Sequence, residues 1–180
     1  MTTIIGIEYD HSCLLVADSQ TTDDNGFIYN HPDIKKLSER NGFIIGGSGE
    51  VLPCDVTQHI WEPPTPTAKD KKDLYHFMIV KVMPSLRKCL SDNGYSFDEP
   101  KTESRFQFLI AVCGEVFDID HDLSVSKNKS GIYAAGSGAP YALGALHAGA
   151  DAHQAMEIAS KLTAFTAGPY ISKEQFKYIK

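Results

Sequence analysis

The sequence lacks a long apolar run, a cysteine cluster and a secretion signal. No stretch approaches the ~18–20 apolar residues that cross a bilayer, and the first residues do not form a basic region followed by an apolar segment. The four cysteines are widely spaced and include no CxxC pair, which favours reduced thiols in a core over a zinc site or a disulfide framework. We therefore expect a cytoplasmic protein with no membrane partner.

Basic charge is also scarce, because 17 Lys and Arg residues stand against 23 Asp and Glu residues and leave a net charge of −6. The basic residues are scattered, whereas proteins that bind a phosphate backbone concentrate them on one face. We therefore expect no nucleic-acid partner. The acidic run at 118–122 lacks the Gly and Glu of a calcium loop, and neither glycine cluster, at 44–50 or 134–140, has a nucleotide-binding pattern. No metal or cofactor is predicted.

What is present suits a single domain over residues 1–180, since a chain of this length with 42% hydrophobic residues can bury a substantial core. Alternating apolar residues predict strands, and apolar residues three or four apart predict helices. The expected strands are 3–9, 14–18, 34–38, 43–47, 106–112, 115–119 and 132–136, with a short extended piece near 170–171. The expected helices are 73–90, bent near Pro84, then 139–150 and 152–162, with a further helical segment ending near Trp61. This order indicates an α+β fold with antiparallel sheets covered by helices.

The start of the chain raises a chemical question. Met1 before a small residue is commonly removed, so the mature chain would begin at Thr2 with a free α-amino group and a hydroxyl on one residue. Thr2 and Thr3 then run directly into an apolar strand. These two threonines therefore form either a catalytic N-terminus or an ordinary one.

Charged residues also stand in or beside apolar strands. Asp18 closes one of them, either as a turn cap or as a charge held for a cationic partner. In "IKKL", strand alternation places Lys35 and Lys36 on opposite faces, so at least one of them points toward packed structure. A partly buried lysine needs a carboxylate. The residues alone leave two interpretations open: one of these lysines pairs with Asp18 at a site, or both belong to an ordinary surface strand with alternating residues.

The ordered set of Thr2-Thr3, "ADSQTT", "KKL", "GGSG" and "AAGSGAPYALG" resembles proteasome β-type subunits and their bacterial relative HslV. The resemblance covers most of the chain and identifies it as similar to the N-terminal nucleophile hydrolases. It implies a four-layer αββα sandwich with two antiparallel sheets packed face to face. It also implies stacked homo-oligomeric rings, hexameric or heptameric, that hydrolyse unfolded polypeptide in an enclosed chamber with an ATP-dependent unfoldase as partner.

The resemblance implies two residues at the reacting centre. Thr2 is the nucleophile once Met1 is lost, and its own α-amine accepts the proton, as in the N-terminal threonine variant of base-activated catalysis. An α-amine with a reference pKa near ~7.7–8.0 suits this task. Lys36 supplies positive charge that favours the neutral amine. Lys35 stays open as the alternative if the register slips by one residue.

Three further residues support that centre in the resemblance. Asp18 pairs with the lysine, and Gly47 offers its backbone N–H to the developing oxyanion, with Gly46 as the adjacent alternative. Ser137 hydrogen-bonds near the amine and helps to relay its proton.

Three positions depart from the family pattern. Where many β subunits have an Asp followed three residues later by a Ser, this chain has Thr163 and Thr166, and Thr163 cannot carry a negative charge. Gln20 stands where the family often has an Arg. Two alternatives to a threonine peptidase therefore remain, namely a non-catalytic structural or regulatory ring subunit and a hydrolase of small amides.

Overall fold

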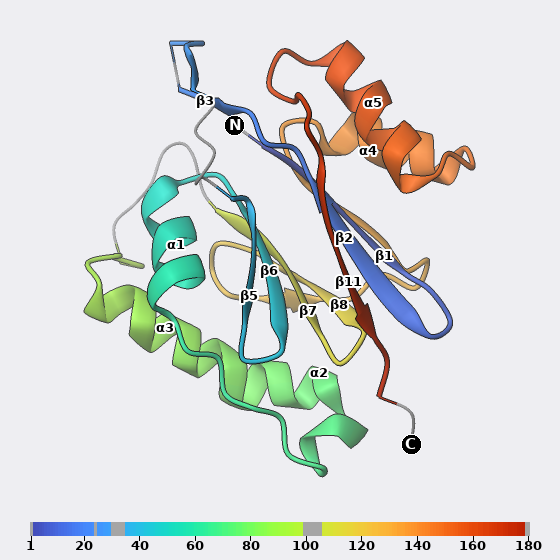
Figure 1. Cartoon of the computed structure of the whole chain (residues 1–180). Coiled ribbons are helices and arrows are strands. Elements are labelled where there is room, and N and C mark those ends of the chain that lie inside the picture. The colour runs from blue at the N-terminus through green and yellow to red at the C-terminus, as the bar shows by residue number, and fades with distance from the viewer. Residues whose placement is uncertain (1, 24, 30–34, 99–105, 179–180) are drawn as a thin grey trace.

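A computed structural model describes residues 2–23, 25–29, 35–98 and 106–178. Two antiparallel sheets dominate it (Figure 1). The first sheet contains, in spatial order, β10 (Ile132–Gly136), β1 (Thr3–Glu8), β2 (Ser12–Ala17) and β11 (Ile171–Phe176). The second contains β5 (Leu37–Arg40), β6 (Phe43–Ser48), β7 (Gln107–Val112), β8 (Glu115–Ile119) and β9 (Val125–Ser126). A two-stranded ribbon of β3 (Thr21–Thr22) and β4 (Ile28–Tyr29) stands apart from both.

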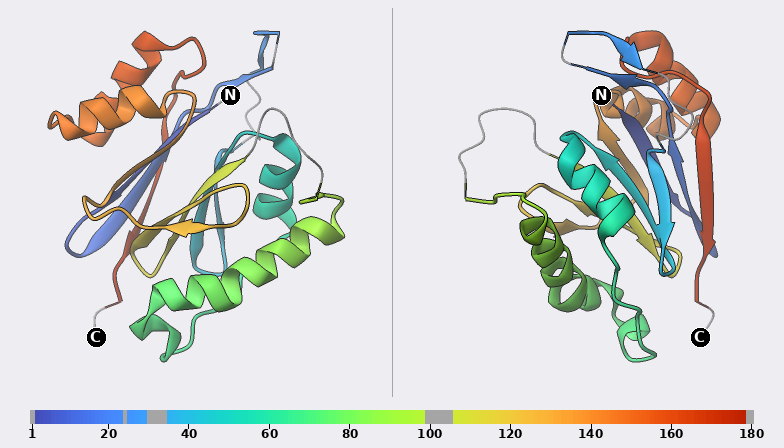
Figure 2. Two further views of the ribbon diagram at one scale, coloured as in Figure 1. Left: turned by 180° about the vertical axis from the view of Figure 1, so that it is seen from behind. Right: turned by 60° about the vertical axis from the view of Figure 1, so that its left-hand side comes forward.

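Helices cover the outer face of each sheet (Figure 2). The first sheet is covered by α4 (Ala139–His147) and α5 (Ala152–Leu162). The second is covered by α1 (Val51–Asp55), the π-helical turn η1 (Val56–Ile60), α2 (Leu74–Phe77), the π-helical turn η3 (Met78–Val82) and α3 (Met83–Asp92), and the short 3₁₀ turn η2 (Asp70–Lys72) precedes α2. Among the described residues, no helix combines the length and the apolar character that a bilayer crossing requires.

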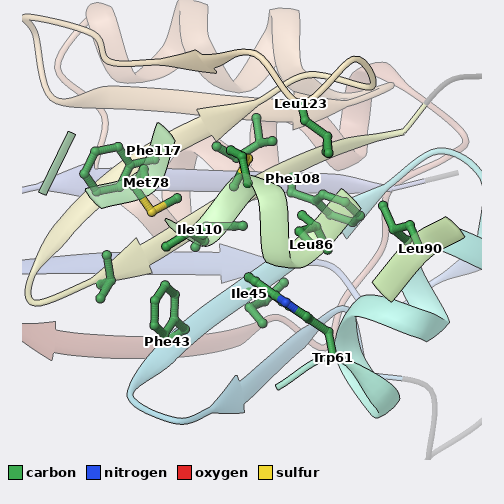
Figure 3. Packing of buried hydrophobic residues seen from close by; sticks show 14 of the residues in the cluster. Phe43, Ile45, Trp61, Met78, Leu86, Leu90, Phe108, Ile110, Phe117 and Leu123 are labelled. Carbon is green, nitrogen blue, oxygen red and sulfur yellow. The ribbon is translucent and has the colours of Figure 1, made fainter. Parts of the chain in front are cut away.

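Three buried clusters hold the layers together. Leu15 of β2 packs with Ile44 and Leu109 of the second sheet, and this cluster fills the space between the two sheets. Ile5 meets Met156 of α5 on the outer face of the first sheet. The largest cluster lies under α2, η3 and α3, where it includes Phe43, Ile45, Trp61, Met78, Leu86, Leu90, Phe108, Ile110, Phe117 and Leu123 (Figure 3). The expected four-layer αββα sandwich is therefore confirmed.

The glycine clusters connect strands to helices. After β6, Gly49 has a φ of +99°, a backbone conformation that glycine adopts at low cost. At the end of β10, Gly136 has a φ of +88°, and Gly138 is the N-cap of α4. Both clusters therefore form tight strand-to-helix turns, and these turns lie close to the start of β1.

Some element bounds differ from those expected. The strand predicted over 34–38 begins only at Leu37, and Ile34 lies outside the described residues. Ser12 belongs to β2 instead of the preceding turn, because it pairs with Phe176 of β11. The helical segment that was expected over 73–90 runs from Leu74 to Asp92 as α2, η3 and α3.

Candidate active site

The peptide unit that joins Thr2 to Thr3 is held at both of its polar atoms. The Thr2 carbonyl oxygen accepts a hydrogen bond from Ser137 Oγ at 3.3 Å. The Thr3 N–H donates to Asp18 Oδ1 at 2.8 Å. Thr2 is 8% exposed and Thr3 is fully buried, so neither end of this peptide is free to turn into water. Met1 lies outside the described residues.

Asp18 lies at the end of β2 and uses both carboxylate oxygens. Oδ1 accepts from the Thr3 amide and from Lys36 Nζ at 2.7 Å. Oδ2 accepts from the backbone N–H of Gln20 at 3.2 Å and from the backbone N–H of Ala167 at 3.4 Å. Because a buried carboxylate is costly unless it is paired and hydrogen-bonded, this set of donors explains how Asp18 can be fully buried. Through Oδ1, Asp18 thus joins Lys36 to Thr3 at the start of β1.

Lys36 is buried and Lys35 is exposed, which distinguishes the two lysines. The Lys36 ammonium forms an ion pair with Asp18 and also donates to the Gln20 carbonyl. Lys36 precedes β5 instead of lying in it, so the alternation of a strand does not govern its direction. The expectation that one lysine points toward packed structure and meets a carboxylate is met by Lys36.

Burial shifts the pKa values of this pair in opposite directions. Removal from water raises the pKa of the Asp18 carboxyl, while the Lys36 charge and the hydrogen bonds to the carboxylate oppose that shift. Removal from water lowers the pKa of the Lys36 ammonium, and Asp18 opposes it. Burial therefore brings the pKa values of Asp18 and Lys36 closer together.

The turn after β10 fits closely around the start of β1. A Cβ atom at Gly136 would lie 2.1 Å from the Thr2 carbonyl oxygen. A Cβ atom at Gly138 would lie 2.1 Å from Thr3 Oγ1. Glycine at both positions therefore allows Ser137, which stands between them, to approach Thr2.

Gly47 lies in β6 opposite Lys36 and donates its N–H to the Lys36 carbonyl at 3.4 Å. For Gly47 to act as an oxyanion donor, this long hydrogen bond would have to give way to one with a substrate oxygen. A Cβ atom at Gly46 would contact Leu37 and Ile4, so that side of Gly46 faces the space between the sheets. The oxyanion role of either glycine stays a prediction.

The loop after α5 completes the surroundings of Thr3. Thr166 is 3% exposed, and its Oγ1 lies 2.5 Å from Thr3 Oγ1. Gln20 Nε2 donates to the Ala164 carbonyl at 2.7 Å, so the residue in the Arg position ties this loop to the end of β2. Thr163 Oγ1 instead accepts locally from the Phe165 amide. From the sequence, Thr166 stands out only as a departure from the family pattern, and no contact is predicted between it and Thr3.

The two packed antiparallel sheets with helices outside them form the proteasome-like αββα fold. The chain shares this fold with BPH- and HslV-type proteins. No protein-family model matches the sequence, and the comparison with curated proteins finds no match.

Solved structures match almost the whole chain. BPH from Thiobacillus denitrificans in complex with epoxomicin has a TM-score of 0.76 at 20% identity, over 98% of this chain and 100% of that chain. A second structure of the same BPH has a TM-score of 0.75 at 20% identity, over 99% of this chain and 100% of that one. Eukaryotic HslV from Trypanosoma brucei has a TM-score of 0.65 at 18% identity, over 97% and 99% of the two chains. At such low identity these likenesses establish the fold.

Proposed function

We propose that the chain is a threonine-type peptidase subunit whose mature form begins at Thr2. The observation that carries the proposal is the clamped peptide unit after Thr2, with Ser137 at its carbonyl and Asp18 at its N–H. Fixing a nucleophile in one geometry is a large part of enzymatic rate acceleration, because a misplacement of ~1 Å costs about a hundredfold.

The proposed reaction begins with attack of Thr2 Oγ1 on a peptide carbonyl. The α-amine of Thr2 takes the hydroxyl proton and later gives it to the leaving amine. Lys36, held as a cation by Asp18, favours the neutral amine by like-charge repulsion. A water molecule, deprotonated by the same amine, then cleaves the ester and releases the second product. Gly47 is the proposed oxyanion donor and Ser137 the proposed relay for the amine proton.

A fluorogenic peptide assay with matched variants tests this proposal. The wild-type protein is first shown by intact mass to lack Met1. We expect it to release the fluorophore, Thr2→Ser to retain part of the rate, and Thr2→Ala to lose at least ~10³-fold, as when a nucleophile is removed. Equal rates for wild type and Thr2→Ala would overturn the proposal.

A small amide is an alternative substrate on the same scaffold, because one fold hosts several activities. Parallel assays with an unstructured protein, a peptide and a small aliphatic amide distinguish these classes. We expect Thr2-dependent turnover of the first two. Turnover of the small amide alone would keep the nucleophile but replace the peptidase assignment.

A non-catalytic ring subunit is the second candidate, and one observation favours it. Thr163, in the position of a family carboxylate, is neutral and its hydroxyl is engaged with Phe165. Under this alternative, purified rings retain Met1 and release no fluorophore.

Ring assembly and an unfoldase partner complete the proposal. The full-length match to HslV supports a ring-forming subunit, and the ATP-dependent unfoldase would deliver unfolded polypeptide to it. One of the matching BPH structures contains epoxomicin. We therefore propose that epoxomicin also binds this chain at Thr2, which a thermal-shift measurement on wild type and Thr2→Ala would test.

A further inference from the structure

The strand β11 lies at the edge of the first sheet and has few apolar residues of its own. It pairs along the whole of β2, from Ile171 opposite Ala17 to Phe176 opposite Ser12 (Figure 1). Its sequence is mostly polar, and Ile171, at its first position, packs against the cluster between the two sheets. Because Lys, Glu and Gln have a low preference for strands, we expect the seating of β11 to draw on contacts that its polar side chains make elsewhere.

The side chain of Gln175 joins β11 to two hairpin turns of the second sheet. Its Oε1 accepts from the backbone N–H of Gly114, in the β7–β8 turn, at 2.9 Å. Its Nε2 donates to the carbonyl of Gly42, in the β5–β6 turn, at 2.7 Å. One amide side chain thus connects the last strand of the first sheet to two hairpins of the second.

Lys177 fastens the end of β11 to a third turn. Its backbone N–H donates to the His11 carbonyl at 2.8 Å, and its Nζ donates to the Tyr9 carbonyl at 2.6 Å, both in the β1–β2 turn. A Cβ atom at Gly114 would lie 2.4 Å from the Lys177 backbone nitrogen, so Lys177 also packs directly on the β7–β8 turn. Together, Gln175 and Lys177 hold three turns at the end of the sandwich that is remote from the start of β1.

The other end of β11 meets the candidate site. Ile171 is paired with Ala17, and Asp18 directly follows Ala17 in the chain. Just before β11, the Ala167 carbonyl accepts from the Ser19 N–H at 3.2 Å. β2 and β11 therefore run side by side from the three turns to the carboxylate that holds the buried lysine.

We propose that β11 is a conformational strap, seated on the three turns through Gln175 and Lys177, and that release of this seating loosens the end of β2 and lowers the activity of the site. The activity part of this inference rests on the proposed function. Short segments open and close as cooperative units, so the loss of the anchor at one end raises the population in which the whole strand has left β2. In that population the chain beside Asp18 is no longer held by β11.

The first test compares Gln175→Ala with Glu174→Ala, an exposed neighbour on the other face of β11. In chains that lack Met1, we expect kcat for a fluorogenic peptide to fall at least about twofold in Gln175→Ala with KM unchanged, because the change lowers the ordered fraction and does not contact substrate. Glu174→Ala should keep wild-type kinetics. Gln175→Glu, which keeps the acceptor for Gly114 and loses the donor to Gly42, should lie between them. An unchanged kcat in Gln175→Ala would overturn the coupling to the site.

Ile110→Val separates the strap from a general loss of stability. This substitution lies in the large cluster under α3 and is moderately destabilising. At a temperature where every variant is folded, Ile110→Val should retain the wild-type kcat although its melting temperature falls. Equal losses of kcat in Ile110→Val and Gln175→Ala would show a general effect of stability and contradict the strap.

Hydrogen exchange gives a readout that does not depend on activity. In Gln175→Ala we expect about tenfold faster exchange at the Gly114 amide, which loses its acceptor, and also at the Ser19 amide beyond the other end of β11. Glu174→Ala should change neither. If the wild-type protein has no Thr2-dependent activity, the peptidase proposal fails, and exchange at Ser19 still decides whether the strap acts along its length. Faster exchange at Gly114 alone would make Gln175 a local clip and overturn the proposal.

Discussion

At the scale of single residues, the candidate site depends on one carboxylate that serves four donors. Asp18 holds Lys36 and the Thr3 amide with one oxygen, and the Gln20 and Ala167 amides with the other. Hydrogen bonds to ionised groups are roughly twice as strong as neutral ones. A change at Asp18 or Lys36 is therefore expected to disturb three chain segments together.

Lys36→Ala should lower the free energy of unfolding by about 3–5 kcal/mol, because it leaves the Asp18 carboxylate buried without its cation. Urea unfolding at neutral pH measures this loss. Lys35→Ala is the matched control, and it should change stability by less than ~0.5 kcal/mol because Lys35 is exposed. Equal effects of the two substitutions would contradict the assignment of Lys36 as the paired lysine.

Stability should fall in alkaline solution, because burial raises the pKa of the Cys13 thiol from 9.0 to about 12 and that of the Cys54 thiol from 9.0 to about 12. A group with a raised pKa in the folded state favours folding below its unfolded pKa, and that contribution is lost as pH rises toward the folded value. The free energy of unfolding should therefore decrease between pH 9 and about pH 12.

A Cys13→Ala, Cys54→Ala double variant provides the control for this pH dependence. Its slope over the same interval should be shallower than that of wild type, whatever its absolute stability. An unchanged slope would show that other groups cause the alkaline loss.

At the scale of elements, two turns bring the site residues together. The β10–α4 turn presents Ser137 to Thr2 because Gly136 and Gly138 leave room for the start of β1. The loop after α5 reaches the same point through Gln20 and Thr166. The site is therefore assembled from segments at both ends of the chain.

Gly138→Ala should destabilise the protein and lower peptidase activity by at least ~10-fold, because the new Cβ would overlap Thr3 Oγ1 at 2.1 Å and displace the start of β1. Gly144→Ala is the matched control in α4, where a Cβ meets no atom within 4 Å. It should stabilise the fold by about 0.5–1 kcal/mol, as glycine in a helix interior is unfavourable. Melting temperature and initial rate measure both effects, and unchanged activity in Gly138→Ala would contradict the proposed close fit.

Much of this arrangement is predictable from local patterns, and the exceptions have physical reasons. The sequence predicts β1, β6, β7 and α5 because their apolar residues follow the period of the element. It predicts only a short extended piece at 170–171, because "ISKEQF" is mostly polar and β11 acquires its six residues by pairing with β2. The bond between Thr3 and Thr166 depends on tertiary contact alone, so no local pattern signals it.

At the scale of the whole molecule, the candidate site and the large apolar core occupy different places in the four-layer fold. The apolar residues under α2 and α3 stabilise the second sheet, while the polar cluster around Asp18 lies at the ends of β2 and β6, near the start of β1. Several large apolar side chains stay exposed in the isolated subunit, among them Phe27, Val51 and Phe176. Their exposure is consistent with a subunit that assembles further.

The proposed enclosed chamber requires assembly into a closed ring. We expect negative-stain images and light scattering of the purified protein to show hexamers or heptamers, single or stacked, because closed rings follow from one repeated head-to-tail interface. Thr2→Ala should assemble in the same way, since it alters the site and not the subunit surface. A protein that remains monomeric at micromolar concentration would contradict the chamber.

The central claim is that Thr2, as the first residue of the mature chain, is the nucleophile. It is tested most directly by intact-mass and peptide-mapping spectrometry after incubation with a peptide vinyl sulfone, an electrophile that captures nucleophilic hydroxyls. We predict one adduct per chain, on Thr2, in chains that lack Met1, and none in Thr2→Ala. Adducts on another residue, or hydrolytic activity in a preparation whose chains all retain Met1, would contradict the account.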